Sequence, residues 1–280
     1  MTTSVTITAQ DVNKLRKITG AGMMDCKHAL IEAQGNYDEA INILRKKGQK
    51  IADKRADREA KEGYVHTLTS DNKTRGIILV LNCETDFVAK NSEFTEHSKR
   101  FAQEILLKFP ESLEELKSIP IDGRPIQDLI TDLVGKIGEK IDISFYGKIE
   151  APYVYGYDHP GNRVAALVGL NKNNTPSIEQ CAKDVAMQIA AMAPVAIDKA
   201  DVPESLIANE LEIARELLRK EGKPEDKIEM IAKGKLEKFY KECTLLNQEF
   251  IKDSKISVGQ YLKNEDKDLT VTKFFRYALG

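Results

Sequence analysis

The side chains most often used for metal binding or nucleophilic catalysis are few and scattered along this chain. No histidine has another histidine three or four residues away, and the cysteines are separated by 57, 98 and 62 residues. Zinc sites and disulfide frameworks need more closely grouped ligands, so we expect neither, and we expect reduced thiols as in a cytosol. The residues are Cys26, Cys83, Cys181 and Cys243, and His28, His66, His97 and His159.

The sequence also lacks the short motifs that mark common catalytic sites. It contains no phosphate-binding G-x-x-x-x-G-K-S/T loop, no G-x-S-x-G nucleophile turn and no H-E-x-x-H metal helix. Acidic residues are abundant, but none stands in an apolar setting that would prepare it for acid–base catalysis. An enzyme is therefore the weaker hypothesis. We expect a protein that acts by binding another macromolecule, with no covalent chemistry, no cofactor and no nucleotide site of its own.

Composition narrows the class of partner and the compartment. The 280 residues include 42 basic and 44 acidic side chains, a formal net charge of −2, which argues against nonspecific nucleic-acid binding. No apolar run approaches the ~18–20 residues that a membrane span needs. Residues 1–8 have neither the basic nor the apolar segment of a secretory signal. We expect a cytoplasmic protein of two or three domains, with no membrane or nucleic-acid partner.

Residues 9–48 predict a compact module of three short helices. Apolar side chains recur at helical spacing in three runs, separated by glycines, and the last helix is expected to end at Gly48. The following stretch, 45–61, carries eight basic residues against three acidic ones. It is either a patch for an anionic partner such as RNA, whose binding would weaken steeply with salt, or a solvated helical linker, and we favour the linker.

A weak internal repeat organises the middle of the chain. Tyr64-Val65 and Tyr153-Val154 each begin a pattern of two strands around a polar turn, and a helical segment follows each. Lys99, Ala102 and Ile105 in the first helix match residues 84 positions later in the second. The sequence therefore predicts two related hairpin-plus-helix units.

The two repeats differ in the connection between strand and helix. From Val80 to Lys99 is nineteen residues, whereas the equivalent stretch from Val168 to Lys183 is fifteen. The four additional residues fall within 83–91. Connections tolerate insertions and often carry binding sites, so this one is a candidate site, although drift in loop length would explain it as well.

The last eighty residues predict a long helical element and a final strand. Residues 204–241 have a helical apolar pattern with one break at Gly222-Lys223-Pro224. This is typical of an antiparallel helical hairpin with a heptad-like seam, acting as a projecting arm or an oligomer contact. Residues 270–279 are rich in β-branched and aromatic side chains and predict a strand.

Two separated segments resemble the signature regions of one protein family. Thr19-Gly20-Ala21-Gly22-Met23-Met24-Asp25-Cys26-Lys27 and Asn82-Cys83-Glu84-Thr85-Asp86-Phe87-Val88-Ala89-Lys90 are similar to those of translation elongation factor Ts. That family exchanges guanine nucleotide on the GTPase elongation factor Tu. The resemblance extends through residues 136–139, 158–168, the helical hairpin and 257–260.

The resemblance implies an α+β fold with a defined order of domains. We expect a three-helix, ubiquitin-associated-like domain over 1–55 with the basic linker following it. A core subdomain over 56–149 would carry the Thr85–Val88 loop, and a second over 150–280 would hold an inserted coiled-coil hairpin at 203–241. Some bacterial members continue beyond the final strand with a helical segment that contacts the GTPase. Here the sequence stops at Gly280, so whether that contact forms stays an open question.

The resemblance also implies which residues bind the partner's GTPase domain. Thr85, Asp86, Phe87 and Val88 look like the element that dislodges Mg²⁺ from elongation factor Tu, with Phe87 as a wedge and Asp86 disturbing the groups around the ion and phosphates. Read from the residues alone, Thr85 or Asp86 is equally a helix cap, worth about 1 kcal/mol. Phe87 is either tucked into the core or held out as an anchor.

Two further contacts are implied outside the loop. Met23 and Met24 look like apolar contacts of the N-terminal module with the same GTPase domain, although methionine is more often core filler. His159 corresponds to a position that contacts a second domain of the partner. The alternative function is a non-catalytic adaptor that uses the three-helix module and the coiled coil, and that hairpin could also make a homodimer.

Overall fold

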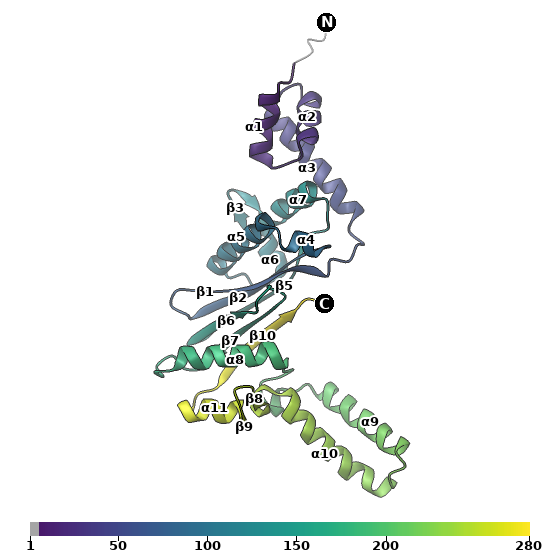
Figure 1. Ribbon diagram of the computed structural model, residues 1–280, viewed down its shortest axis with the longest axis vertical. Coiled ribbons are helices and arrows are strands. Elements are labelled where there is room, and N and C mark those ends of the chain that lie inside the picture. Colours follow the sequence, from purple (N-terminus) through teal and green to yellow (C-terminus); the bar gives the residue numbers. More distant parts are fainter. Residues whose placement is uncertain (1–5) are drawn as a thin grey trace. The chain divides into compact units, whose positions relative to one another are not determined.

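Local start and stop signals set several of the helix ends in the computed structural model, which describes residues 6–280 (Figure 1). Thr8 and Asp11 form a reciprocal capping box at the first helix, and the Asn36 side chain caps the third. Gly20 and Gly138 end two helices in the left-handed conformation that favours glycine. The N-terminal stretch for which we expect no secretory signal lies mostly outside the described residues.

The chain divides into two compact units, and helices combine with antiparallel strands, which confirms the α+β class. Unit 1 comprises the described residues up to Val65, together with Leu79–Tyr146 and the last two residues. Unit 2 comprises His66–Ile78 and Gly147–Ala278. Within residues 6–280, no helix is both long and apolar enough to cross a membrane.

Unit 1 begins with the three predicted helices. Their small core includes Leu15, Cys26, Leu30 and Ala40, all fully buried. The helices are α1 (Ala9–Thr19), α2 (Met23–Glu32) and α3 (Tyr37–Lys54).

The expectation that the third helix ends at Gly48 is wrong, because α3 continues to Lys54. Gly48 lies in the helix interior and is buried against α7 (Ile126–Ile137). A Cβ atom on Gly48 would lie 3.0 Å from the backbone oxygen of Thr131, and Gly135 of α7 lies opposite. The glycine therefore permits close helix packing and does not stop the helix.

Two glycine-to-alanine substitutions should change the free energy of unfolding in opposite directions, because Gly135 lies at this contact and Gly234 does not. In Gly135→Ala the new Cβ would meet the Cα of Gly48 at 2.9 Å, so α3 and α7 must separate. We expect a loss of about 1–2 kcal/mol in the free energy of unfolding. A Cβ atom added to Gly234, inside α10 (Glu225–Cys243), would have no neighbouring atom within 4 Å. Gly234→Ala should gain about 0.5–1 kcal/mol. Urea unfolding of both variants checks the signs, and a stabilised Gly135→Ala would contradict the packing.

The rest of unit 1 places one loop between a buried strand and a buried helix. Strands β1, β2 and β5 form a sheet in that order. Every residue of β2 after Arg75 is buried, and α5 buries Phe94 and Phe101 completely. The elements are β1 (Glu62–Thr69), β2 (Arg75–Cys83), α4 (Asp86–Ala89), α5 (Ser92–Lys108), α6 (Leu113–Ser118), β3 (Pro120–Ile121), β4 (Arg124–Pro125), α7 and β5 (Asp142–Glu150).

Unit 2 contains the second predicted hairpin and helix. Strand β7 pairs antiparallel with β6 on one side and with β10 on the other, and α8 packs on this sheet (Figure 1). The predicted strands at 153–170 and 270–279 and the helix around 183–189 are thereby confirmed. The elements are β6 (Tyr153–Asp158), β7 (Val164–Leu170), α8 (Ile178–Met192), η1 (Lys199–Asp201), η2 (Leu245–Asn247), β8 (Glu249–Phe250), β9 (Asp253–Ser257), α11 (Val258–Glu265) and β10 (Val271–Ala278).

The helical element of unit 2 consists of α9 (Glu204–Lys220) and α10, separated at the predicted break. Ala214 and Leu218 from α9 and Ile228 and Ala232 from α10 form one buried cluster. Arg215 of α9 also pairs with Glu229 of α10, with Nε and Oε1 2.6 Å apart.

Candidate functional site

The candidate loop is held by a helix cap at its start. Strand β2 ends at Cys83, and α4 is a single turn that begins at Asp86. Thr85 is extended and its Oγ1 accepts a hydrogen bond from Val88 N at 3.4 Å, so the predicted capping role is confirmed. Asn91 then caps α5 through Glu93 N at 2.9 Å. Two caps in seven residues give the connection a fixed conformation.

Phe87 is held out from this turn. Its side chain is 83% exposed, more than any other large apolar residue among the exposed ones of the described chain. Of the two alternatives that the sequence left open, the ring is presented to solvent and contributes nothing to the core. Leaving a phenylalanine exposed forgoes about 2–3 kcal/mol of burial. A ring in this position is available to a partner.

Asp86, beside Phe87, is an ionised carboxylate on the same turn. Its Oδ2 accepts a hydrogen bond from Lys90 Nζ at 2.6 Å. This hydrogen bond and the lysine charge hold the pKa of Asp86 below its usual value. The loop therefore presents an apolar ring and a negative charge side by side.

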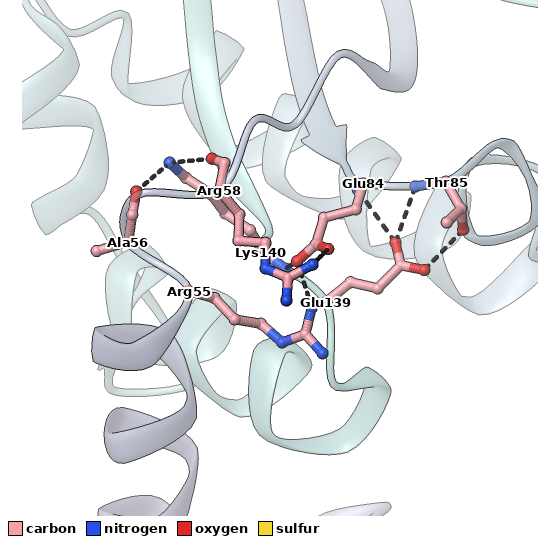
Figure 2. A network of polar contacts seen from close by, with 7 residues as sticks. All are labelled: Arg55, Ala56, Arg58, Glu84, Thr85, Glu139 and Lys140. Atoms are coloured by element: carbon pink, nitrogen blue, oxygen red, sulfur yellow. Dashed lines mark hydrogen bonds and ion pairs between the residues drawn. The ribbon is translucent and has the colours of Figure 1, made fainter.

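The base of the loop is bound by a residue to which the sequence pattern assigns no role. The carboxylate of Glu139 accepts hydrogen bonds from the backbone N–H groups of Glu84 and Thr85, each at 3.0 Å, and from Thr85 Oγ1 at 2.6 Å (Figure 2). Glu139 directly follows Gly138, the left-handed residue that ends α7. In the sequence, only one observation points to Glu139: it lies in residues 136–139, a stretch included in the family resemblance.

Glu84 makes the reciprocal contact. Its Oε1 accepts from the backbone N–H of Lys140 and from Arg55 NH1, both at 2.6 Å (Figure 2). Lys140 Nζ in turn donates to the backbone oxygens of Ala56 and Arg58, at 2.6 and 2.9 Å. We call Glu84 and Glu139 the glutamate clasp, because the side chain of each binds the backbone of the segment that carries the other.

The charge state of Glu84 fits this arrangement. Burial tends to raise the pKa of Glu84, but the Lys140 hydrogen bond and the pairing with Arg55 outweigh it and leave the pKa below its usual 4.5. The carboxylate is thus ionised at neutral pH. Its stabilising contribution is present above pH ~4.5 and is lost as the pH falls through the lowered value.

Cys83, at the end of β2, provides a chemical test of this packing. The thiol is fully buried and donates to the backbone oxygen of Thr85 at 3.1 Å. Burial, with smaller contributions from the charges of Glu139 and Glu62, raises the pKa of Cys83 to about 12. Since only the thiolate reacts, iodoacetamide at pH 8 should label Cys83 at least about a thousandfold more slowly in the native chain than in urea. Mass spectrometry after timed labelling measures this, and rapid native labelling would contradict the packed loop base.

The N-terminal pair of predicted site residues also lies at the surface. Met23 and Met24 are the first two residues of α2 and are 55% and 58% exposed. Ile18, near the end of α1, is 58% exposed. The two methionines are therefore not core filler. They belong to unit 1, as do the four residues of the loop.

His159 belongs to unit 2, in the turn between β6 and β7. Its imidazole is exposed, and Nδ1 lies 3.1 Å from the hydroxyl of Tyr157. Among the described residues no group of three or more histidine, cysteine or acidic side chains is placed to hold a metal ion.

Known proteins resemble this chain over almost its whole length. A family model described as "Elongation factor TS" matches residues 84–280. Proteins named "Elongation factor Ts" from Christiangramia forsetii and Amoebophilus asiaticus are each 50% identical over 274 residues, 98% of this chain and 99% of theirs. One from Porphyromonas gingivalis is 48% identical over 276 residues, 98% of each chain.

These matches define the class as that of translation elongation factors. Within it, the chain belongs to the elongation factor Ts family, as the two signature-like segments predict. The family model begins at Glu84, at the candidate loop, whereas the relatives also cover the three N-terminal helices.

Proposed function

We propose that this chain is the guanine-nucleotide exchange factor of elongation factor Tu in the cytoplasm. It binds elongation factor Tu with GDP, disturbs the Mg²⁺ and phosphate site, and promotes GDP release so that GTP can bind. Family membership supports this proposal. The observation that carries it is Phe87, held 83% exposed on a turn capped by Thr85, beside an ionised Asp86.

In this mechanism Phe87 enters the partner's GTPase domain as a wedge. A buried aromatic anchor commonly supplies ~2 kcal/mol or more of interface free energy. Asp86 brings a negative charge near the Mg²⁺ ion and disturbs its ligands. Loss of the ion removes charge neutralisation from the phosphates, which weakens GDP binding. Thr85 and Val88 hold the turn that presents both side chains.

The energetic requirement is modest. Accelerating release a thousandfold requires lowering the barrier by about 4 kcal/mol. Binding is also reciprocal. If the factor weakens the binding of GDP to elongation factor Tu, GDP weakens the binding of the factor by the same ratio. No covalent step is needed, and the cellular excess of GTP over GDP sets the direction of exchange.

The other elements would hold the loop in place. We propose that the ubiquitin-associated-like module over 1–55 binds the same GTPase domain through Met23 and Met24, and that His159 contacts a second domain. The core subdomains are assigned to 56–149 and 150–280. The pair α9–α10, within 203–241, is assigned as a coiled-coil arm that also offers a homodimer contact.

The coupling between GDP and this chain tests the proposal against a non-catalytic adaptor. Calorimetric titration of the chain into nucleotide-free and GDP-bound elongation factor Tu gives the two dissociation constants. An exchange factor binds the nucleotide-free partner far more tightly. Equal affinities would identify an adaptor. In a separate titration with RNA, binding that does not change with salt concentration would remove the RNA-binding alternative.

A further inference from the structure

We propose that Glu139 is a positioning residue for nucleotide exchange, which holds the Thr85–Val88 loop in the conformation that presents Phe87 and Asp86. This inference rests on the proposed function and adds to it a residue from a different part of the chain. Glu139 lies more than fifty positions after the loop, at the end of α7. The three hydrogen bonds that its carboxylate accepts all come from the loop base.

All the polar atoms of Thr85 make hydrogen bonds. Its N–H and its hydroxyl both donate to Glu139, so the hydroxyl lone pairs remain for Val88 N. Its carbonyl oxygen accepts from Cys83 Sγ at 3.1 Å and from Ala89 N at 3.2 Å. With every polar atom of Thr85 bound, the turn that carries Phe87 has one preferred orientation.

Glu139 binds the base of the loop through both oxygens of its carboxylate. Hydrogen bonds to a carboxylate are stronger than those to a neutral acceptor. A glutamine at this position keeps the shape but has only one acceptor oxygen. Its amide nitrogen would face either the two backbone donors or the Thr85 hydroxyl. In the first orientation two donors oppose each other, and in the second the hydroxyl loses its acceptor.

Glu84, the other half of the clasp, also holds the base of the loop. Glu84 accepts from Lys140 N and so holds the Glu139–Lys140 segment against the loop, while Arg55 and Lys140 connect it to the residues that leave α3 (Figure 2). The loop base is thus fixed both to the end of α7 and to the end of α3. The ring of Phe87 is exposed, so its direction depends on this support at the base of the turn.

The test compares Glu139→Gln with Asp132→Asn. Asp132 lies on α7 and pairs with Arg124 NH1 at 2.7 Å, away from the loop, so its variant controls for loss of a paired carboxylate. With elongation factor Tu and fluorescent GDP, we expect Glu139→Gln to lower the maximal release rate at saturating factor by about 10- to 100-fold, since small misplacements are costly. The half-saturating concentration should change less. Asp132→Asn should match the wild type.

A double-mutant cycle separates positioning from general structure. If Glu139 acts through Phe87 and Asp86, Glu139→Gln should have little further effect in a background that carries both Phe87→Ala and Asp86→Ala. Amide hydrogen exchange should show lost protection at Thr85 and Val88 in Glu139→Gln, with no change in the core of α5.

The outcomes distinguish this inference from the proposed function. A wild-type chain that accelerates release, with Glu139→Gln equally active or with additive effects in the cycle, overturns the inference and leaves the function intact. A wild-type chain that does not accelerate release overturns the function and the role of Glu139 in exchange together. Unchanged amide protection at Thr85 in Glu139→Gln would overturn the claim that Glu139 holds the loop.

Discussion

Phe87→Ala is expected to lower the acceleration of GDP release by about 30-fold or more while the chain stays folded. The factor follows from ~2 kcal/mol of lost anchoring, at about tenfold for each 1.4 kcal/mol. Because the ring is 83% exposed, its removal takes almost nothing from the core. We expect the free energy of unfolding to change by less than about 0.5 kcal/mol.

Stopped-flow measurement with fluorescent GDP gives the rate of GDP release. Urea unfolding gives the free energy of unfolding. Leu107→Ala is the matched control, because Leu107 is also in unit 1 and is 71% exposed, but lies at the end of α5. It should leave release unchanged. If Phe87→Ala releases GDP as fast as the wild type does, the wedge is wrong, and if both variants are slow, the effect is not specific to the loop.

Phe94→Ala should do the reverse of Phe87→Ala: it should destabilise the chain strongly and change GDP release little. Phe94 lies seven positions after Phe87, in the first turn of α5, and is fully buried. Truncating a buried phenylalanine leaves a cavity and typically costs about 3–5 kcal/mol, so we expect a loss of that size in the free energy of unfolding.

Stopped-flow GDP release and urea unfolding of Phe94→Ala are measured at a temperature where this variant is still mostly folded. The folded fraction should then release GDP at close to the wild-type rate, because the loop and its clasp are not altered. A small loss of stability would mean that α5 is not packed as described. Equal effects of Phe87→Ala and Phe94→Ala on stability would remove the distinction between anchor and core.

The burial of Phe94 could be predicted from the sequence, whereas the exposure of Phe87 could not. Helical spacing places Phe94 on the buried side of α5, but Phe87 falls in a connection, where residue type gives no direction for the ring. The Thr85 cap could be predicted because capping depends on residues three positions apart. The exposure of Met23 and Met24 could not, because methionine fills cores as readily as it makes contacts.

The roles of Gly48 and Glu139 could not be predicted, for a common reason. A glycine after an apolar run is a frequent helix stop, and only the approach of α7 shows that this one serves close packing. Glu139 binds atoms 54 and 55 positions earlier in the chain. Neither partner carries a periodic pattern that would pair the two segments. Short-range signals therefore predicted the elements, whereas contacts between distant segments decided how the candidate loop is held.

The clasp also gives a physical reason for an exposed ring to persist on a stable chain. The turn gains its stability from Thr85 and Glu139 and not from burying Phe87. The apolar surface of the ring is thus left for an interface, where it adds to binding without a prior cost of extraction from the core.

The most direct test of exchange is GDP release from elongation factor Tu in stopped flow, with this chain at about one tenth of the partner's concentration. Each factor molecule should then act on many partners, and all bound fluorescent GDP should leave faster than it does alone, with less acceleration as Mg²⁺ is raised. Release at the unassisted rate, with a folded chain and a cognate partner, would contradict the proposed function.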